Sequence, residues 1–142
     1  MADRICNLLQ RYRTVAVVGL SPKPERDSHR VARYLQEQGF RIIPVNPGQR
    51  KILGEICYPS LSSIPEPLEI VDVFRRSDAI LPIAEEAVQS GARVFWMQLG
   101  IRNDEAMKRL NEAGVEVVMG RCIKIEYMRC RQGKRPGEED SC

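Results

Sequence analysis

Short apolar runs recur along the chain and are separated by more polar segments. Runs of β-branched and apolar residues lie at 14–20, 41–46, 68–74, 92–98 and 115–119. Consecutive apolar positions are typical of strands buried on both faces of a parallel sheet, whereas a half-exposed strand alternates. The pattern therefore predicts about five interior strands.

Segments with helical spacing lie between these strands. Val31, Tyr34 and Leu35 repeat at i, i+3 and i+4 on one predicted helix, and Asp27 or Ser28 is expected to cap its start. Further helices are predicted at 82–89, 103–113 and 123–130. The stretch 48–67 is rich in turn residues, with a short helix or strand expected around 58–64.

The alternation of strands and helices indicates the fold class. Strands joined by helices of about 10 residues form βαβ units and a parallel sheet with right-handed crossovers. We therefore expect an α/β, Rossmann-type, doubly wound parallel sheet of about five strands in a three-layer αβα arrangement. Residues 1–130 are predicted to form this single domain, followed at 131–142 by a disordered polar tail whose only apolar residue is the final cysteine.

Composition narrows the classes of partner. The chain has 142 residues, of which 43% are hydrophobic and 29% charged, as in an ordinary globular domain. Its net charge of +3 suits an anionic small molecule, and with 6% aromatic residues no nucleic-acid-binding surface is expected. No stretch approaches the roughly 18 apolar residues of a membrane span. The first residues lack a signal-peptide core, so no membrane association and a cytoplasmic location are expected.

The cysteines and the histidine indicate neither a metal site nor a catalytic site. The five cysteines are scattered without a C-x-x-C pair, and the single histidine cannot complete a Cys/His ligand set, so reduced, mostly structural thiols are expected. That histidine, His29, lies in the first turn of a predicted helix, where a structural role is favoured. No Ser-His-Asp set or pair of catalytic carboxylates can be assembled, so no catalytic residue is predicted.

The loop after the first strand is a candidate anion site. Ligands of doubly wound sheets bind at the carboxyl ends of the strands, and the following helix offers free N–H groups to a phosphate. Gly19 could begin a G-x-G-x-x-G fingerprint, but Ser21 and Pro24 replace its other two glycines. Lys23 and Arg26 can meet phosphates where backbone contacts are lost, unless they merely solvate the loop.

The loops after the other strands extend this candidate site. The second strand ends at Asn46 without the carboxylate that holds the ribose of NAD, and Arg50 and Lys51 follow within a few residues. The incomplete glycine fingerprint and the missing ribose carboxylate both favour a phosphorylated adenine nucleotide that is held differently from NAD. Arg76, in the loop after the third strand, could clamp a diphosphate or could be a solvated loop residue.

Five segments carry a resemblance to a known family. They read Val-Val-Gly-Leu-Ser-Pro-Lys-Pro-Glu-Arg-Asp-Ser-His-Arg-Val at 17–31, Val-Asn-Pro at 45–47, Leu-Gly-Glu-Ile-Cys-Tyr-Pro-Ser-Leu at 53–61, Val-Asp-Val-Phe-Arg at 71–75 and Gly-Arg-Cys-Ile-Lys-Ile-Glu-Tyr at 120–127. In this order they resemble the small stand-alone CoA-binding proteins, which are similar to the N-terminal CoA-binding domain of the succinyl-CoA synthetase α subunit. The resemblance covers about residues 5–130.

The resemblance implies a site for coenzyme A along the carboxyl ends of the strands. The residues that it implies around the diphosphate are Gly19, Leu20, Ser21, Lys23 and Arg26. Those implied on the adenosine side are Val45, Asn46 and Pro47, and those on the opposite wall are Phe74, Arg75 and Arg76. The pantetheine path would be bordered by Leu99 and Gly100. The 3′-phosphate of CoA agrees with the missing ribose carboxylate.

The expected function is binding of CoA or acyl-CoA without catalysis. In the synthetase, a phosphohistidine on a second domain carries the chemistry, and this chain has no room for that domain. Cys122 follows the fifth strand and could approach the thiol of CoA, although a buried structural thiol is the stronger expectation. Two alternatives remain: an NADP-dependent oxidoreductase or redox sensor, and an interaction protein with an empty cleft. A protein partner and the choice between monomer and homodimer stay open.

Overall fold

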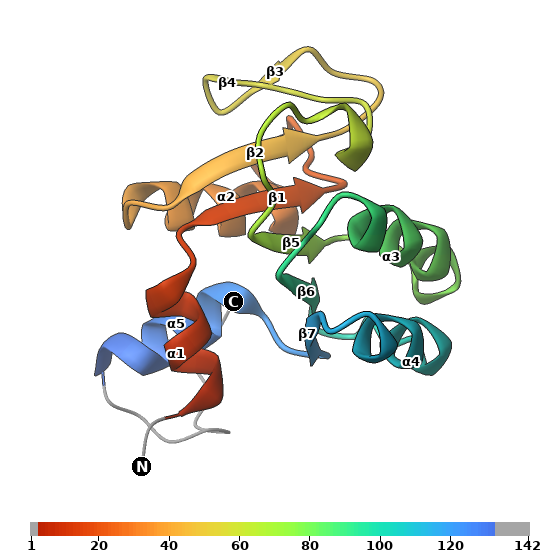
Figure 1. Cartoon of the computed structure of the whole chain (residues 1–142). Coiled ribbons are helices and arrows are strands. Elements are labelled where there is room, and N and C mark those ends of the chain that lie inside the picture. The colour runs from red at the N-terminus through yellow and green to blue at the C-terminus, as the bar shows by residue number, and fades with distance from the viewer. Residues whose placement is uncertain (1–2, 133–142) are drawn as a thin grey trace.

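Five parallel strands form the centre of the molecule (Figure 1), and the computed structural model describes residues 3–132. The strand order is β2-β1-β5-β6-β7, and every neighbouring pair is parallel. The strands are β1 Thr14–Val18, β2 Arg41–Val45, β5 Ile70–Val73, β6 Val94–Met97 and β7 Glu116–Met119. The predicted α/β class and the five-stranded parallel sheet are confirmed.

Helices cover both faces of the sheet, as Figure 1 shows. One face carries α1 Arg4–Arg11, α2 Asp27–Glu37 and α5 Ile123–Gln132, and the other carries α3 Ile80–Gln89 and α4 Asp104–Glu112. Successive side chains of β1 point alternately into the two apolar cores. Val15 and Val17 lie in one core, and Ala16 and Val18 lie in the other. Both faces of β1 are therefore buried and apolar, which explains why a continuous apolar run marked this strand.

The sheet changes winding direction between β1 and β5. The chain leaves β1 through α2 to β2 on one side, and it leaves β5 through α3 to β6 on the other. The loops that follow β1 and β5 therefore diverge at the carboxyl edge and leave room between them. This is the switch point at which ligands bind to doubly wound sheets.

Three elements were not expected. The helix α1 precedes the sheet, and a hairpin of β3 Lys51–Ile52 and β4 Glu55–Ile56 turns at Leu53 and Gly54, which both have positive φ. Two consecutive positive φ values define the tight turn that favours a short hairpin. A short helix, η2 Ser77–Ala79, leads into α3, so this helix begins at Ile80 and not at Pro82. The stretch around 58–64 contains both predicted possibilities, because Tyr58 bridges β2 and η1 Leu61–Ser63 follows.

Several boundaries differ by one or two residues from the predicted ones, among them those of α2 and α5. Arg26, rather than Asp27 or Ser28, is the N-cap of α2, because the Ser28 hydroxyl accepts from the N–H of Ser21 instead. The helix α5 extends to Gln132, so the first two residues of the expected tail are helical. The rest of that tail lies outside the described residues. Within residues 3–132, no helix is long and apolar enough to cross a bilayer.

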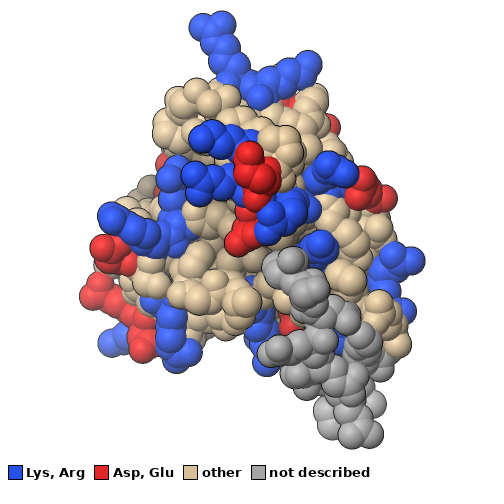
Figure 2. All heavy atoms as spheres, turned by 180° about the vertical axis from the view of Figure 1, so that it is seen from behind, with Lys and Arg blue, Asp and Glu red and all other residues tan. Residues whose placement is uncertain are grey.

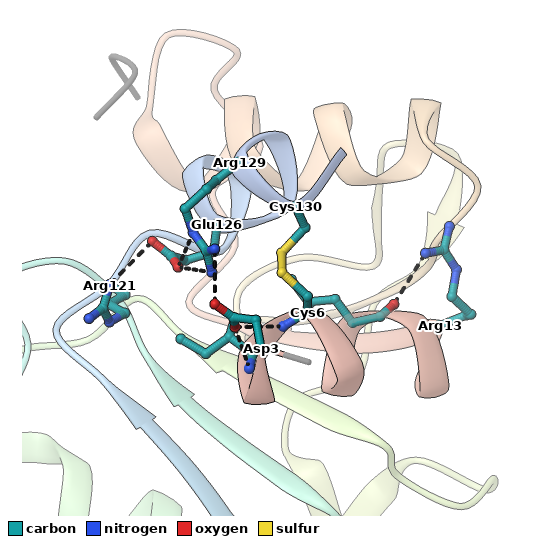
Figure 3. Close-up of a disulfide and its surroundings, with 9 residues drawn as sticks. Asp3, Cys6, Arg13, Arg121, Glu126, Arg129 and Cys130 are labelled. Atoms are coloured by element: carbon teal, nitrogen blue, oxygen red, sulfur yellow. Dashed lines mark hydrogen bonds and ion pairs between the residues drawn. A yellow bond between two sulfur atoms is a disulfide. The ribbon is translucent and has the colours of Figure 1, made fainter. Parts of the chain in front are cut away.

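A disulfide joins Cys6 of α1 to Cys130 of α5 (Figure 3), with Cα atoms 5.6 Å apart and a sequence separation of 124. The expectation that the thiols are reduced was therefore wrong for this pair. The physical reason is that α1, which apolar spacing did not reveal, packs against α5 and brings the two cysteines together. Cys57 is buried as a thiol, and Cys142 lies outside the described residues.

Candidate functional site

Gly19 ends β1 in a space that admits no side chain. Its φ is +85°, and a Cβ at this position would lie 2.5 Å from the carbonyl oxygen of Phe74. The N–H of Gly19 donates to the carbonyl of Val45 at 2.9 Å, and the N–H of Phe74 donates to that of Val18 at 2.9 Å. The ends of β2, β1 and β5 are thus held together around a bare stretch of backbone, which a ligand can approach closely.

The loop after Gly19 is fastened to the first turn of α2. The N–H of Ser21 donates to the Ser28 hydroxyl at 3.0 Å, and the Ser21 hydroxyl accepts from the N–H of Lys23 at 3.1 Å. The carbonyl of Ser21 lies 2.9 Å from Nδ1 of buried His29. A carbonyl oxygen only accepts, so Nδ1 carries the hydrogen in this contact. His29 therefore has the structural role that the sequence favoured.

A hollow of about 380 Å³ opens between this loop and α2. The residues that line it, called the α2 hollow below, are Gly19, Ser21, Lys23, Arg26, Asp27, Ser28 and Phe74. The first N–H groups of a helix have no intrahelical acceptor, and the N-cap residue Arg26 supplies no side-chain acceptor here. The start of α2 therefore presents donors and a partial positive charge at this hollow.

Cationic side chains surround the α2 hollow. Lys23 and Arg26 are exposed, and Nε of Arg75 lies 3.2 Å from the position that a Cβ of Gly19 would take. The one acid in the lining, Asp27, pairs with Arg30 of the next helical turn. Figure 2 shows Lys and Arg side chains gathered on the face that α2 covers, with fewer acidic groups among them. The hollow is thus suited to an anion.

The residues predicted on the adenosine side have mixed roles. Val45 is 4% exposed, and Leu20, which was predicted beside the diphosphate, is 0% exposed; the side chains of both belong to the cores, and only their backbone reaches the carboxyl edge. Asn46 links two loops: its Nδ2 donates to the carbonyl of Leu20 at 2.9 Å, and its Oδ1 accepts from the N–H of Gly48 at 2.9 Å. Pro47, next along the chain, is exposed.

A second hollow, of about 660 Å³, follows the ends of β5 and β6. The residues that line it, called the η2 hollow below, are Phe74, Arg75, Arg76, Ala79 and Ile101. Phe74 lines both hollows, so they adjoin each other at this residue. The predicted pantetheine-path residues Leu99 and Gly100 lie directly before Ile101, and Leu99 is 64% exposed.

Four lining residues escaped the sequence analysis as site residues. Asp27 and Ser28 were seen only as caps, although a helix start at a ligand-binding edge was a usable signal. Ala79 and Ile101 carry no motif, and only the packing of η2 beside the loop after β6 places them together.

Two buried groups lie beneath the carboxyl edge. Cys122 is 2% exposed in the apolar core, which confirms the prediction of a buried thiol. Asp72, two residues before Phe74 on β5, is fully buried, and its carboxylate oxygens have no hydrogen-bond partner within the described residues. Burial, and to a smaller extent nearby Cys122, raises the pKa of Asp72 well above its usual value. Burial thus favours the uncharged form of Asp72, which is a core residue rather than a group that a ligand can reach.

The start of α5 is held against the same edge. The Oε1 of buried Gln98 accepts from the N–H of Ile123 at 3.0 Å, and Nε1 of Trp96 donates to the carbonyl of Arg121 at 2.7 Å. The N–H of Ile123 at this helix start thus already has a protein acceptor, whereas no side chain caps the start of α2. Among residues 3–132, no cluster of three or more His, Cys, Asp or Glu residues could hold a metal ion.

Comparison with known proteins agrees with this geometry. A family model described as a CoA binding domain matches residues 13–128. The uncharacterized protein YneT of Bacillus subtilis is 46% identical over 123 residues, covering 87% of this chain and 91% of YneT. A hypothetical protein from Pyrococcus horikoshii, of known structure, is 42% identical with a TM-score of 0.87 and covers 89% of both chains.

A larger enzyme contains a similar segment. The ADP-forming acetate–CoA ligase I of Archaeoglobus fulgidus is 28% identical over 121 residues, which are 78% of this chain but only 18% of the ligase. The similarity thus concerns one part of that enzyme, and the family match covers most of the present chain. The family predicted from the sequence is confirmed: the chain belongs to the CoA binding domain family.

Proposed function

We propose that the protein binds coenzyme A at the carboxyl edge of its sheet, with the diphosphate in the α2 hollow. The observation that carries this proposal is the coincidence of a bare backbone at Gly19, a helix start and three cationic side chains at the switch point of a CoA-binding-domain chain. A neutral ligand would gain little from this arrangement, whereas a diphosphate would use all three features.

The residues at the α2 hollow fit a diphosphate. The N–H groups at the start of α2 would donate to its oxygens, and Lys23, Arg26 and Arg75 would neutralise its charge. Any side chain at position 19 would collide with the end of β5, so the close approach that the phosphates need is built into the backbone. The missing glycines of the fingerprint are thus replaced by side-chain charge.

The adenosine half would lie toward the end of β2. Asn46 there is already engaged in holding loops, and no carboxylate of that strand end is positioned for a ribose diol. Arg50 and Lys51 are exposed at the start of the β3–β4 hairpin, beside the Asn46 loop. These two cations are our candidates for the 3′-phosphate.

We further propose that the chain has no catalytic step of its own and that its bound or free state is read by a partner protein. Its one histidine donates to the backbone carbonyl of Ser21, and no side-chain hydroxyl or thiol of residues 3–132 is shown hydrogen-bonded to it. The ligase activity belongs to a protein of which this chain covers 18%. Binding alone is therefore what the described residues support.

Isothermal titration tests the proposal directly. The purified, nucleotide-free protein is titrated with CoA, dephospho-CoA and NADPH. We expect micromolar CoA binding, weaker binding of dephospho-CoA and no binding of NADPH. Equal affinity for CoA and dephospho-CoA would remove the 3′-phosphate assignment, and a preference for NADPH would overturn the proposed ligand in favour of a redox function.

A further inference from the structure

The walls of the η2 hollow are mainly apolar, although two arginines border it. Phe74, Ala79 and Ile101 supply the ring, methyl and branched aliphatic surfaces. The guanidinium of Arg76 is turned outward, because the side chain is 87% exposed and its Nε pairs with Asp78 at 3.4 Å. Arg75 reaches back over Gly19, toward the α2 hollow. What remains for an occupant of the η2 hollow is apolar surface.

The η2 hollow is also continuous with the proposed CoA site. Phe74 lines both hollows, and they lie on the two sides of the switch point between β1 and β5. A ligand whose phosphates occupy the α2 hollow and whose other end runs along the sheet edge away from β2 would pass Phe74 and enter the η2 hollow. The volume of about 660 Å³ is within the range of small-molecule pockets.

An exposed leucine adds a second, independent observation. Leu99 is 64% exposed although it is a large apolar side chain, and it is one of two such residues among those described. It lies two residues before Ile101 in the loop after β6. Leu99 thus adds apolar surface beside the hollow, which an occupant could also contact.

We propose that the η2 hollow receives the acyl chain of a CoA thioester, so that the physiological ligand is an uncharged, straight-chain acyl-CoA rather than free CoA. This inference rests on the proposed function, since the nucleotide must first be held in the α2 hollow. A charged acyl group is disfavoured because Phe74, Ala79 and Ile101 offer it only apolar side chains.

Titration with a matched pair of ligands tests the inference. CoA and hexanoyl-CoA are titrated into the full chain under reducing-agent-free conditions that keep the Cys6–Cys130 bond intact. Full burial of one methylene is worth about a fourfold gain in affinity. The hollow is open to solvent, so the acyl chain is only partly buried and each methylene contributes less than this fourfold gain. We therefore expect hexanoyl-CoA to bind about tenfold more tightly than CoA.

Two variants locate the acyl chain. Ile101→Asn makes one wall polar, and Ala79→Trp fills the hollow; in each variant the affinity for hexanoyl-CoA is expected to exceed its own affinity for CoA, measured alongside, by less than about twofold. The matched control is Ile56→Asn, since Ile56 is 66% exposed on the β3–β4 hairpin, beyond β2 and far from this hollow (Figure 1). Circular dichroism and melting curves establish that each variant is folded.

The outcomes separate this inference from the proposed function. Equal binding of CoA and hexanoyl-CoA would overturn the acyl site and leave CoA binding intact. An advantage for hexanoyl-CoA that survives in both Ile101→Asn and Ala79→Trp would also overturn it, because the chain would then lie elsewhere. Binding of neither ligand would instead reject the proposed function itself.

Discussion

Basic side chains have different surroundings in two regions of the molecule, the corner between α1 and α5 and the carboxyl edge of the sheet. In the corner (Figure 3), Arg129 is 2% exposed and bonds to Glu126 at 2.9 Å and to Asp3 at 3.0 Å, beside the disulfide. At the carboxyl edge, Lys23, Arg26 and Arg75 form no ion pair with any of residues 3–132.

The difference separates stabilising charge from charge that is available to a ligand. Burying Arg129 is tolerable only because acidic partners lie within hydrogen-bond distance, so that cluster serves the fold. The cations at the edge stay hydrated and cost the fold little, and they gain an anionic partner only when a ligand arrives. Basic residues therefore stabilise the fold in the corner and are available to a ligand at the carboxyl edge. Substitutions can test this difference.

The largest expected effect is on ligand affinity at the carboxyl edge. Lys23→Ala combined with Arg75→Ala should weaken CoA binding by more than tenfold, because hydrogen bonds to charged groups contribute about 1.5–3 kcal/mol each. Melting temperature should hardly change, since neither cation forms an ion pair within residues 3–132. The control is Arg102→Ala with Lys108→Ala in the α4 region, and calorimetry should give it wild-type affinity. Unchanged binding in the first variant would remove both phosphate roles.

The buried cation of the corner should show the reverse behaviour. Arg129→Leu should destabilise the fold by about 3–5 kcal/mol, because it leaves Glu126 buried without its main partner. Its control is Arg121→Leu, which removes a half-exposed partner 3.5 Å from the same carboxylate and should cost less than about 1 kcal/mol. Urea unfolding monitored by Trp96 fluorescence measures both. Equal effects of the two variants would mean that burial does not decide the strength of this cluster.

The disulfide should stabilise the molecule without contributing to ligand binding. Cys6→Ser with Cys130→Ser should lower stability by about 2–4 kcal/mol, since the bond closes a loop of nearly the whole domain. That corresponds to a melting temperature lower by roughly 10 °C. Wild-type protein in reductant should melt like the variant, and its CoA affinity should not change. If reductant leaves the melting temperature of the wild type unaltered, the bond does not hold the two helices in solution.

The smallest expected effect concerns Asp72, beneath the carboxyl edge. Its pKa is raised in the folded state by burial, so the native protein keeps a proton that the unfolded chain releases above about pH 3.9. Stability should therefore fall as pH rises from that value toward the folded-state pKa.

The substitution Asp72→Asn removes the titrating carboxyl group and, with it, this pH dependence of the stability. We expect the variant to be more stable than the wild type by about 1 kcal/mol at pH 7 and no more stable at pH 4. Melting curves between pH 4 and pH 8 give the comparison. A variant that is less stable than the wild type at pH 7 would show that Asp72 is ionised and has a favourable role.

Much of the candidate site could be predicted because its signals are local. Gly19, Lys23, Arg26 and the loops after the strands stand next to apolar runs that are recognisable from periodicity, and parallel topology brings such loops to one edge. The direction in which each side chain points could not be predicted from such local signals. Leu20 and Val45 occur within the expected motifs, yet their side chains turn into the cores.

The sequence by itself determined the strands, most of the helices, the parallel sheet and the family, because apolar spacing and short motifs are properties of neighbouring residues. Tertiary structure alone decided the Cys6–Cys130 bond, the pairing of Arg129 with Asp3 and the η2 hollow formed by Ala79 and Ile101. Each of these joins residues that are distant in the chain. Their meeting depends on how α1, α5 and η2 pack on the finished sheet, a cooperative result that no local pattern encodes.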